Sequence, residues 1–379
     1  DARHHGHGPV LAAWAENVAT SGSSRVVHIF SRSGTLLEQV VPRYAGAVSC
    51  LEWDPSGDVL AVAQRGSSNV LLFSISTRRL DSIDAGGKDV TFLRFDQTGE
   101  HLAVGTARGA VNVVHLPSRE RRTVPSKQKH RVLCGDWSRD GVLAYATEDR
   151  QVTFCNAYGE LLDRVKVKLR PASLRHGARR RGAEPVVSLN MDGATLLLYS
   201  LADKDGALEL AFQERYGRIV SHRWFGDGFL IVCFSSGYVV VVSTAYSEIG
   251  REQYCARVTQ GELVDACYCP QTFTVAACCT DSVQLVNLRT WTEVGSYVLD
   301  RDAGAAARCE WVGDCGTTLS VSTTDGCLYV FRVRPGGGGG GEESGTEGAH
   351  LSALLRPLPL ARFLALVLIV AAAGGGGGG

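Results

Sequence analysis

The sequence predicts an all-β fold, a β-propeller of seven or eight blades. The first observation is a repeated pattern, in which a strand ends in Trp, a Gly- or Asp-bearing turn follows, and a second apolar strand begins. Its four best copies are CLEWDPSGDVLAV, CGDWSRDGVLAYA, HRWFGDGFLIVCF and CEWVGDCGTTLSV. Repetition of this kind indicates one supersecondary unit copied several times.

The second observation is the spacing of the copies. The intervals are 39, 42, 42, 87, 45 and 42 residues between the successive markers Trp14, Trp53, Phe95, Trp137, Trp224, Cys269 and Trp311. A period of about 40–45 residues with several strands in each unit is typical of WD-repeat propeller blades.

The third observation is a further strand after a short turn in each unit. Examples are NVLLFS, VNVVHL, VTFCNA, YVVVVS and LYVFRV, and the turns before them carry residues such as Arg108-Gly109 and Asp149-Arg150. Gly and Asp supply the positive φ that tight hairpins need. The fourth strand is less apolar, as in LLEQVV and ERRTV, because an outer strand is solvated.

The interval of 87 residues predicts a degenerate unit, blade five, with strands RVKVKLR, PVVSLNM, ATLLLYSL and LELAFQE. This gives eight unit signatures from Trp14 to Phe331, although seven blades is the commoner design. The chain begins without Met at a strand-like segment. We therefore expect an upstream stretch, such as a ring-closing strand.

Composition divides the chain into three parts. We predict a propeller over residues 1–335, a Gly-rich and acidic linker over 336–348, and an apolar low-complexity tail over 349–379 that could start a following domain. The longest apolar run of the tail, Phe363 to Ala373, is 11 residues, shorter than the ~20 that a membrane span needs. Lys plus Arg equals Asp plus Glu, 39 each, so no global charge favours nucleic acid. The 12 Cys lack zinc-ligand spacing and are expected to be buried, reduced thiols.

The repeated aromatic residues could form a binding surface or fill the space between blades. They end an inner strand just before a turn, where a large ring packs between neighbouring blades. We therefore predict inter-blade packing for Trp14, Trp53, Phe95, Trp137, Trp224 and Trp311.

A basic segment in the predicted fifth blade is the candidate partner surface. No acid occurs between Asp163 and Glu184, and period-two alternation places the cations of RVKVKLR on one strand face. The segment could bind an acidic protein or a phosphoinositide head group, or it could be a solvated edge strand followed by an insertion. The candidate residues are Arg164, Lys166, Lys168, Arg170, Arg175, Arg179, Arg180 and Arg181.

Catalytic and cofactor motifs are absent from the sequence. There is no GxSxG, no GxxxxGK[ST], no HExxH and no GxGxxG on a strand-to-helix turn. The N-terminal His4, His5 and His7 could bind a metal, but at a chain terminus we do not expect a built site. The sequence therefore predicts a non-enzymatic protein with no cofactor and no metal.

Four segments carry a resemblance to a known family. They are CLEWDPSGDVLAV, FLRFDQTGEHLAVGTARGAVNVVHL, HRVLCGDWSRDGVLAYATEDRQVTFCNAYGE and YGRIVSHRWFGDGFLIVCFSSGYVVVVST. Together they resemble the N-terminal propeller of a subunit of intraflagellar transport complex A, from about Cys50 to Phe331. One departure is that the third strands lack the expected WD dipeptide; the only WD is Trp53-Asp54.

The resemblance implies a scaffold for retrograde transport in cilia and flagella and for ciliary entry of membrane proteins. It implies partners among the other complex A subunits, a tubby-like cargo adaptor and membrane-protein cargo, and indirectly complex B and the dynein motor, with no nucleic acid. It implies a location in the cilium and basal body with a cytoplasmic pool, and leaves open peripheral membrane contact. The alternatives are a vesicle-coat or general WD-repeat adaptor and, in another class, an enzymatic propeller.

Overall fold

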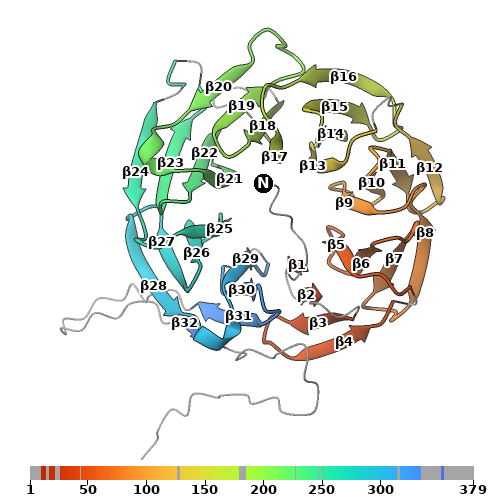
Figure 1. The fold of residues 1–379 in the computed structure, drawn as a ribbon, viewed down its shortest axis with the longest axis horizontal. Helices are drawn as coiled ribbons and strands as arrows, with labels where there is room; N and C mark the ends of the chain where they lie inside the picture. Colours follow the sequence, from red (N-terminus) through yellow and green to blue (C-terminus); the bar gives the residue numbers. More distant parts are fainter. Residues whose placement is uncertain are drawn as a thin grey trace, which may run out of the picture.

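Eight four-stranded antiparallel sheets form a closed ring in the computed structural model (Figure 1). The structure describes residues 10–13, 17–21, 26–42, 44–125, 129–178, 185–226, 228–245, 247–249, 251–313, 316–333 and 351–353. Each sheet is one blade, and we number the blades in chain order. The all-β propeller that the sequence predicts is confirmed, and the number of blades is eight.

Every blade is built from four consecutive strands, and the first strand of each lies on the inner circle of the ring (Figure 1). The strands of blades 1 and 2 are β1 (Val10–Ala13), β2 (Asn17–Ser21), β3 (Val27–Ser31), β4 (Leu36–Val40), β5 (Val48–Trp53), β6 (Val59–Gln64), β7 (Asn69–Ser74) and β8 (Leu80–Asp84). Those of blades 3 and 4 are β9 (Val90–Phe95), β10 (His101–Thr106), β11 (Val111–His115), β12 (Glu120–Thr123), β13 (Val132–Trp137), β14 (Val142–Thr147), β15 (Gln151–Asn156) and β16 (Leu161–Lys166).

The second half of the ring follows the same plan. Blades 5 and 6 contain β17 (Pro171–Ala178), β18 (Pro185–Met191), β19 (Thr195–Tyr199), β20 (Leu208–Ala211), β21 (Ile219–Phe225), β22 (Phe229–Phe234), β23 (Tyr238–Ser243) and β24 (Glu252–Arg257). Blades 7 and 8 contain β25 (Leu263–Cys269), β26 (Thr274–Cys279), β27 (Ser282–Asn287), β28 (Thr292–Val298), β29 (Ala306–Trp311), β30 (Thr318–Thr323), β31 (Leu328–Val333) and β32 (Leu351–Ala353). The described helices are two 3-10 turns, η1 (Glu214–Tyr216) and η2 (Arg301–Ala303).

The turn after the aromatic residue explains why the repeated pattern folds as it does. In blade 2, Asp54 follows Trp53, and its Oδ1 accepts a hydrogen bond from the Val59 backbone N–H at 2.8 Å. Gly57 completes the turn with φ 74°, a left-handed conformation that costs Gly nothing. Asp96 caps the equivalent turn of blade 3, accepting from the backbone N–H of His101 at 3.2 Å. In blades 2 and 3 the acid after the aromatic residue therefore fixes the first hairpin, whereas Phe225 and Val312 stand at this position in blades 6 and 8.

The second hairpin also shows the predicted left-handed residues. Gly109, Gly237 and Gly326 have φ of 82°, 81° and 83°. In blade 4 the conformation falls on Arg150, with φ 66°. An L-residue with a side chain adopts this region less readily than Gly, so this blade keeps the turn geometry without the residue that favours it.

Side-chain packing holds the ring together at the contacts between blades. The buried apolar residues form eight clusters, each made of residues from two neighbouring blades. The cluster between blades 8 and 1 is the smallest among the described residues, with Val18, Phe30, Val312, Leu328 and Val330. The hydrophobic core of this protein is therefore eight separate layers arranged around the ring.

The ring closes between β1 and the strands of blade 8, which lie in contact. Blade 1 takes its four strands from residues 10–40; the upstream stretch that we expected would precede the described residues and stays a prediction. Blade 8 is completed by β32, in which Leu351 pairs with Val333. Three residues of the predicted tail thus pair with the propeller, beyond the boundary predicted at residue 335; residues 354–379 lie outside the described residues.

Blade 5 differs from the prediction in its first strand. The segment RVKVKLR is not a strand of this blade, since it supplies the end of β16, the outer strand of blade 4, and the connection that follows. The inner strand is β17, where His176 pairs with Val187 as Trp53 pairs with Leu60 in blade 2. The later three strands, PVVSLNM, ATLLLYSL and LELAFQE, correspond to β18, β19 and β20. A search based on Trp misses β17 because His occupies the aromatic position.

Candidate functional site

The repeated aromatic residues lie where adjacent inner strands meet. Trp137 donates from its indole Nε1 to the Arg94 carbonyl of the preceding blade at 3.1 Å. Trp311 does the same to the Cys267 carbonyl at 3.3 Å. Trp53 and Phe95 belong to the clusters between blades 1 and 2 and between blades 2 and 3, while Trp14 lies outside the described residues.

Trp224 packs against blade 5 in a different way. Its Nε1 donates to Ser188 Oγ at 2.8 Å, and its ring lies against Gly177, where a Cβ atom would sit 2.1 Å from the ring carbon Cδ2. In blade 7 the aromatic position belongs to Tyr268, which pairs with Val275. The marker Cys269 that the sequence suggested is one residue too late.

The candidate basic residues do not form one surface. Arg164 and Lys166 lie on β16 at the rim of blade 4, and Lys168 and Arg170 lie in the connection to blade 5. Arg175 lies on the innermost strand β17, so it is separated from the rim by the width of a blade. Arg179, Arg180 and Arg181 lie outside the described residues.

Acids and carbonyls partly compensate the cations of this rim. Lys168 pairs with Glu209 of blade 5 at 3.0 Å, and Arg170 lies 3.5 Å from Glu148. Arg164 donates to the Pro125 carbonyl at 3.1 Å. Lys166 is exposed, and within the described ranges it has no ion pair. The rim of blades 4 and 5 is therefore less basic than the sequence suggests.

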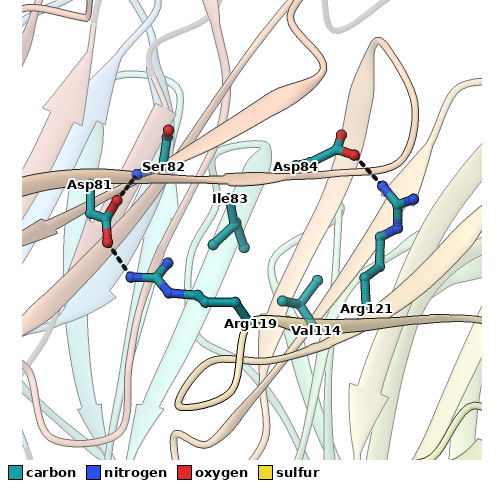
Figure 2. A pocket seen from close by; sticks show the side chains of 7 residues that line it. All are labelled: Asp81, Ser82, Ile83, Asp84, Val114, Arg119 and Arg121. Atoms are coloured by element: carbon teal, nitrogen blue, oxygen red, sulfur yellow. Dashed lines mark hydrogen bonds and ion pairs between the residues drawn. The ribbon is translucent and has the colours of Figure 1, made fainter.

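A hollow of about 490 Å³ lies at the rim between blades 2 and 3. Arg119 reaches Asp81 and Arg121 reaches Asp84, with Ile83 between the two ion pairs (Figure 2). The backbone N–H of Gly86, and then Arg121, lower the pKa of Asp84. Arg119 and Arg121 therefore join the outer edges of blades 2 and 3 at this point.

The inner strands carry a charged network that the sequence reasoning missed. Arg94 on β9 donates from Nη1 to Glu52 at 2.9 Å and from Nε to Asp136 at 3.0 Å. All three groups directly precede the aromatic residue of their strand and are 42 residues apart, which is the signal that could have revealed them. The triad therefore links the inner strands of blades 2, 3 and 4.

Burial and neighbouring charges set the ionisation of these acids. Burial raises the pKa of Glu52, whereas Arg94 holds the pKa of Asp136 below its usual range despite the burial of that carboxyl. Glu310, at the same position of blade 8, has its pKa raised to about 7 by burial and then by the charge of Glu52. Glu310 of blade 8 also acts on Arg175 of blade 5, three blades away along the ring, so these side chains face a common centre.

The described part of the chain contains neither a metal-binding cluster nor a membrane-spanning helix. No group of three or more His, Cys, Asp or Glu side chains there could hold a metal ion. The predicted metal candidates His4, His5 and His7 precede the first described residue. The helices in this part are short 3-10 turns, and none has the length or apolar content to cross a bilayer. The cysteines of the described residues are free thiols.

Comparison with known proteins gives a family match over most of the chain. Residues 10–326 match the family of the WDR19 first beta-propeller. The human protein WD repeat-containing protein 19 is 29% identical over 360 residues, 92% of this chain and 26% of its own length. The WD repeat-containing protein dyf-2 of Caenorhabditis elegans is 26% identical over 258 residues, 65% of this chain and 18% of its own. The chain thus spans about a quarter or less of the length of these relatives.

Solved structures with the same fold are more distant in sequence. A computationally designed protein, Ika8, superposes with a TM-score of 0.71 at 13% identity, covering 87% of this chain and 98% of that one. The Sqt1 protein of Saccharomyces cerevisiae gives 0.70 at 14% identity, with coverage of 88% and 97%. These likenesses show the propeller fold alone.

Proposed function

The chain belongs to the family of WDR19 first β-propellers, and from this premise we propose that it is a non-enzymatic scaffold domain of intraflagellar transport complex A. The observation that carries the proposal is the family match over residues 10–326. In this role the propeller supports retrograde transport in cilia and flagella and the ciliary entry of membrane-protein cargo.

The architecture supports a scaffolding role. Its apolar clusters lie between blades, so the turns and the outer strands are left for contacts with other proteins. The outer strand β12, for example, is exposed along its whole length. A ring of this kind presents several binding edges without changing its own shape.

We propose that partners include the other complex A subunits and a cargo adaptor of the tubby-like class. The basic segment is our candidate for one such contact, through exposed Lys166 and through Arg179, Arg180 and Arg181, which lie outside the described residues. Acidic protein surfaces would be attracted to this segment. The proposed location is the cilium or flagellum, including the basal body, with a cytoplasmic pool.

The test is affinity purification of the tagged protein from ciliated cells, followed by identification of the recovered proteins. Recovery of complex A subunits is the expected result. Recovery of vesicle-coat subunits in their place would contradict the proposal and favour a coat adaptor.

The role of the basic segment needs a matched pair of variants. Reversing Arg179, Arg180 and Arg181 to Glu is expected to reduce partner recovery while the thermal midpoint stays unchanged. The control reverses three exposed cations elsewhere, Lys88, Arg108 and Arg218, with the same change in net charge. Equal recovery with the two variants would remove the basic segment from the proposal.

A further inference from the structure

Two arginines lie at equivalent positions of neighbouring inner strands. Arg175 on β17 pairs with Ser188, and Arg223 on β21 pairs with Ile231. Each directly precedes the aromatic position of its strand, as Glu52, Arg94 and Asp136 do in blades 2 to 4. Around the inner circle, the Glu52–Arg94–Asp136 triad of blades 2 to 4 is therefore followed by two arginines in blades 5 and 6.

The two arginines differ from Arg94 in their partners. Arg94 contacts two carboxylates, whereas within the described ranges neither Arg175 nor Arg223 lies in an ion pair. Arg223 donates from Nη1 to the His222 carbonyl at 3.1 Å, and the Nε of Arg175 is buried with no hydrogen-bond partner. A buried donor of a charged group without an acceptor is costly.

Nearby acids do not supply the missing acceptor. Asp136 is already bound by Arg94 and accepts the backbone N–H of His176 at 3.0 Å. Glu310 acts on both arginines, and Glu52 on Arg175, through their charges and without a described hydrogen bond to either arginine. These acids therefore leave the cationic pair without a direct partner.

Mutual repulsion is visible in the ionisation of this part of the ring. The charge of Arg223, followed by burial, lowers the pKa of Arg175 to about 9. Burial, and then Arg175 and Arg223, lower the pKa of the neighbouring His222 to about 3. A bound anion would relieve this repulsion.

We propose that Arg175 and Arg223 form an oxyanion site that binds a phosphate group at the inner circle between blades 5 and 6. Two guanidinium groups carry two positive charges and planar sets of N–H donors, which match the charge and the oxygens of a phosphate dianion. The phosphate could be free in solution or part of an inositol polyphosphate. The site is independent of the scaffold function proposed above.

The test is thermal unfolding of the whole chain in increasing inorganic phosphate, with NaCl adjusted to constant ionic strength. The wild-type midpoint is expected to rise with phosphate, because a ligand that binds only the folded state stabilises it. Arg223→Met is expected to weaken phosphate binding at least ~10-fold, as for the loss of a charged hydrogen bond. It is also expected to raise the midpoint in the absence of phosphate, because it removes the repulsion.

The control is Arg139→Met, which removes an exposed cation of blade 4 and is expected to leave the phosphate response unchanged. Arg223→Lys keeps the charge and covers the case that Arg223→Met does not fold; it is expected to bind phosphate more weakly than wild type. Half-saturation at a lower concentration of inositol hexakisphosphate than of phosphate would identify the polyphosphate as the source, and equal values would identify free phosphate.

Two results would overturn the proposal. One is a phosphate response in Arg223→Met equal to that of wild type, which would mean that phosphate acts on the protein only as a general salt. The other is a lower midpoint of Arg223→Met without phosphate, combined with an unchanged affinity in isothermal titration, which would make the arginine a structural residue.

Discussion

The contact between Gly177 and Trp224 gives a sharp prediction about how blades 5 and 6 pack. A Cβ at Gly177 would lie 2.1, 2.3 and 2.5 Å from three atoms of the Trp224 ring, well inside van der Waals contact. The ring would have to move by about 1 Å or more, and its 2.8 Å hydrogen bond to Ser188 would be lost. Overpacking costs roughly 1–3 kcal/mol and the hydrogen bond about 1 kcal/mol. We expect Gly177→Ala to lower the free energy of unfolding by about 3 kcal/mol.

The assay is urea unfolding followed by tryptophan fluorescence and circular dichroism, arranged as a double-mutant cycle. Trp224→Leu leaves room for the new methyl group, so Gly177→Ala should cost less than about 1 kcal/mol in that background. Gly141→Ala is the control: it has φ 73° with nothing within 4 Å of the new Cβ, so only backbone strain of about 1–2 kcal/mol is expected. An equal cost of Gly177→Ala in both backgrounds would refute the steric explanation.

Three further predictions concern the inner charges and the ring closure. Arg94→Met should lower stability by about 2–3 kcal/mol because two partly buried carboxylates lose their partner, and adding Asp136→Asn should recover part of the loss in urea unfolding. Burial raises the pKa of Glu310 to about 7 in the folded state, so the free energy of unfolding should fall as pH rises from roughly 4.3, the unfolded value, through 7. The thermal midpoint of Glu310→Gln should fall less over this range. A pH profile of the variant parallel to that of wild type would contradict this. Phe30→Ala, at a side chain 3% exposed, should cost about 3 kcal/mol by leaving a cavity; a change below 1 kcal/mol in urea unfolding would show that the cluster between blades 8 and 1 does not hold the ring.

Most of the fold follows from the sequence because its repeat is local. The aromatic residue, its capping turn and the apolar second strand lie within about a dozen residues, so each hairpin can be recognised by itself. The prediction for blade 5 is wrong at its first strand, because His176 stands at the position of the Trp or Phe marker. His176 divides the 87-residue interval into 39 and 48 residues. The alternation of RVKVKLR predicts a strand of blade 5, but its first residues belong to β16 of blade 4.

The charges of the inner circle could not be assembled from the sequence by the same reasoning. Glu52, Arg94 and Asp136 are single residues in three separate repeats. Only the packing of neighbouring blades brings the two carboxylates to 2.9 and 3.0 Å from the Arg94 guanidinium. In the sequence, Arg175 belongs to the basic segment because it is close to other cations along the chain. Strand register, which places it beside Arg223, depends on pairings that a linear count does not contain.

The arrangement of complete blades has a consequence for how the chain could be rewired. Among the described residues, the first and last parts of the propeller share no sheet, because β1 to β4 and β29 to β32 each form a blade of their own. A circular permutation that joined β32 to β1 and opened the chain before β5 would leave every sheet intact. The order of the blades along the sequence would then change, while their order around the ring would stay the same.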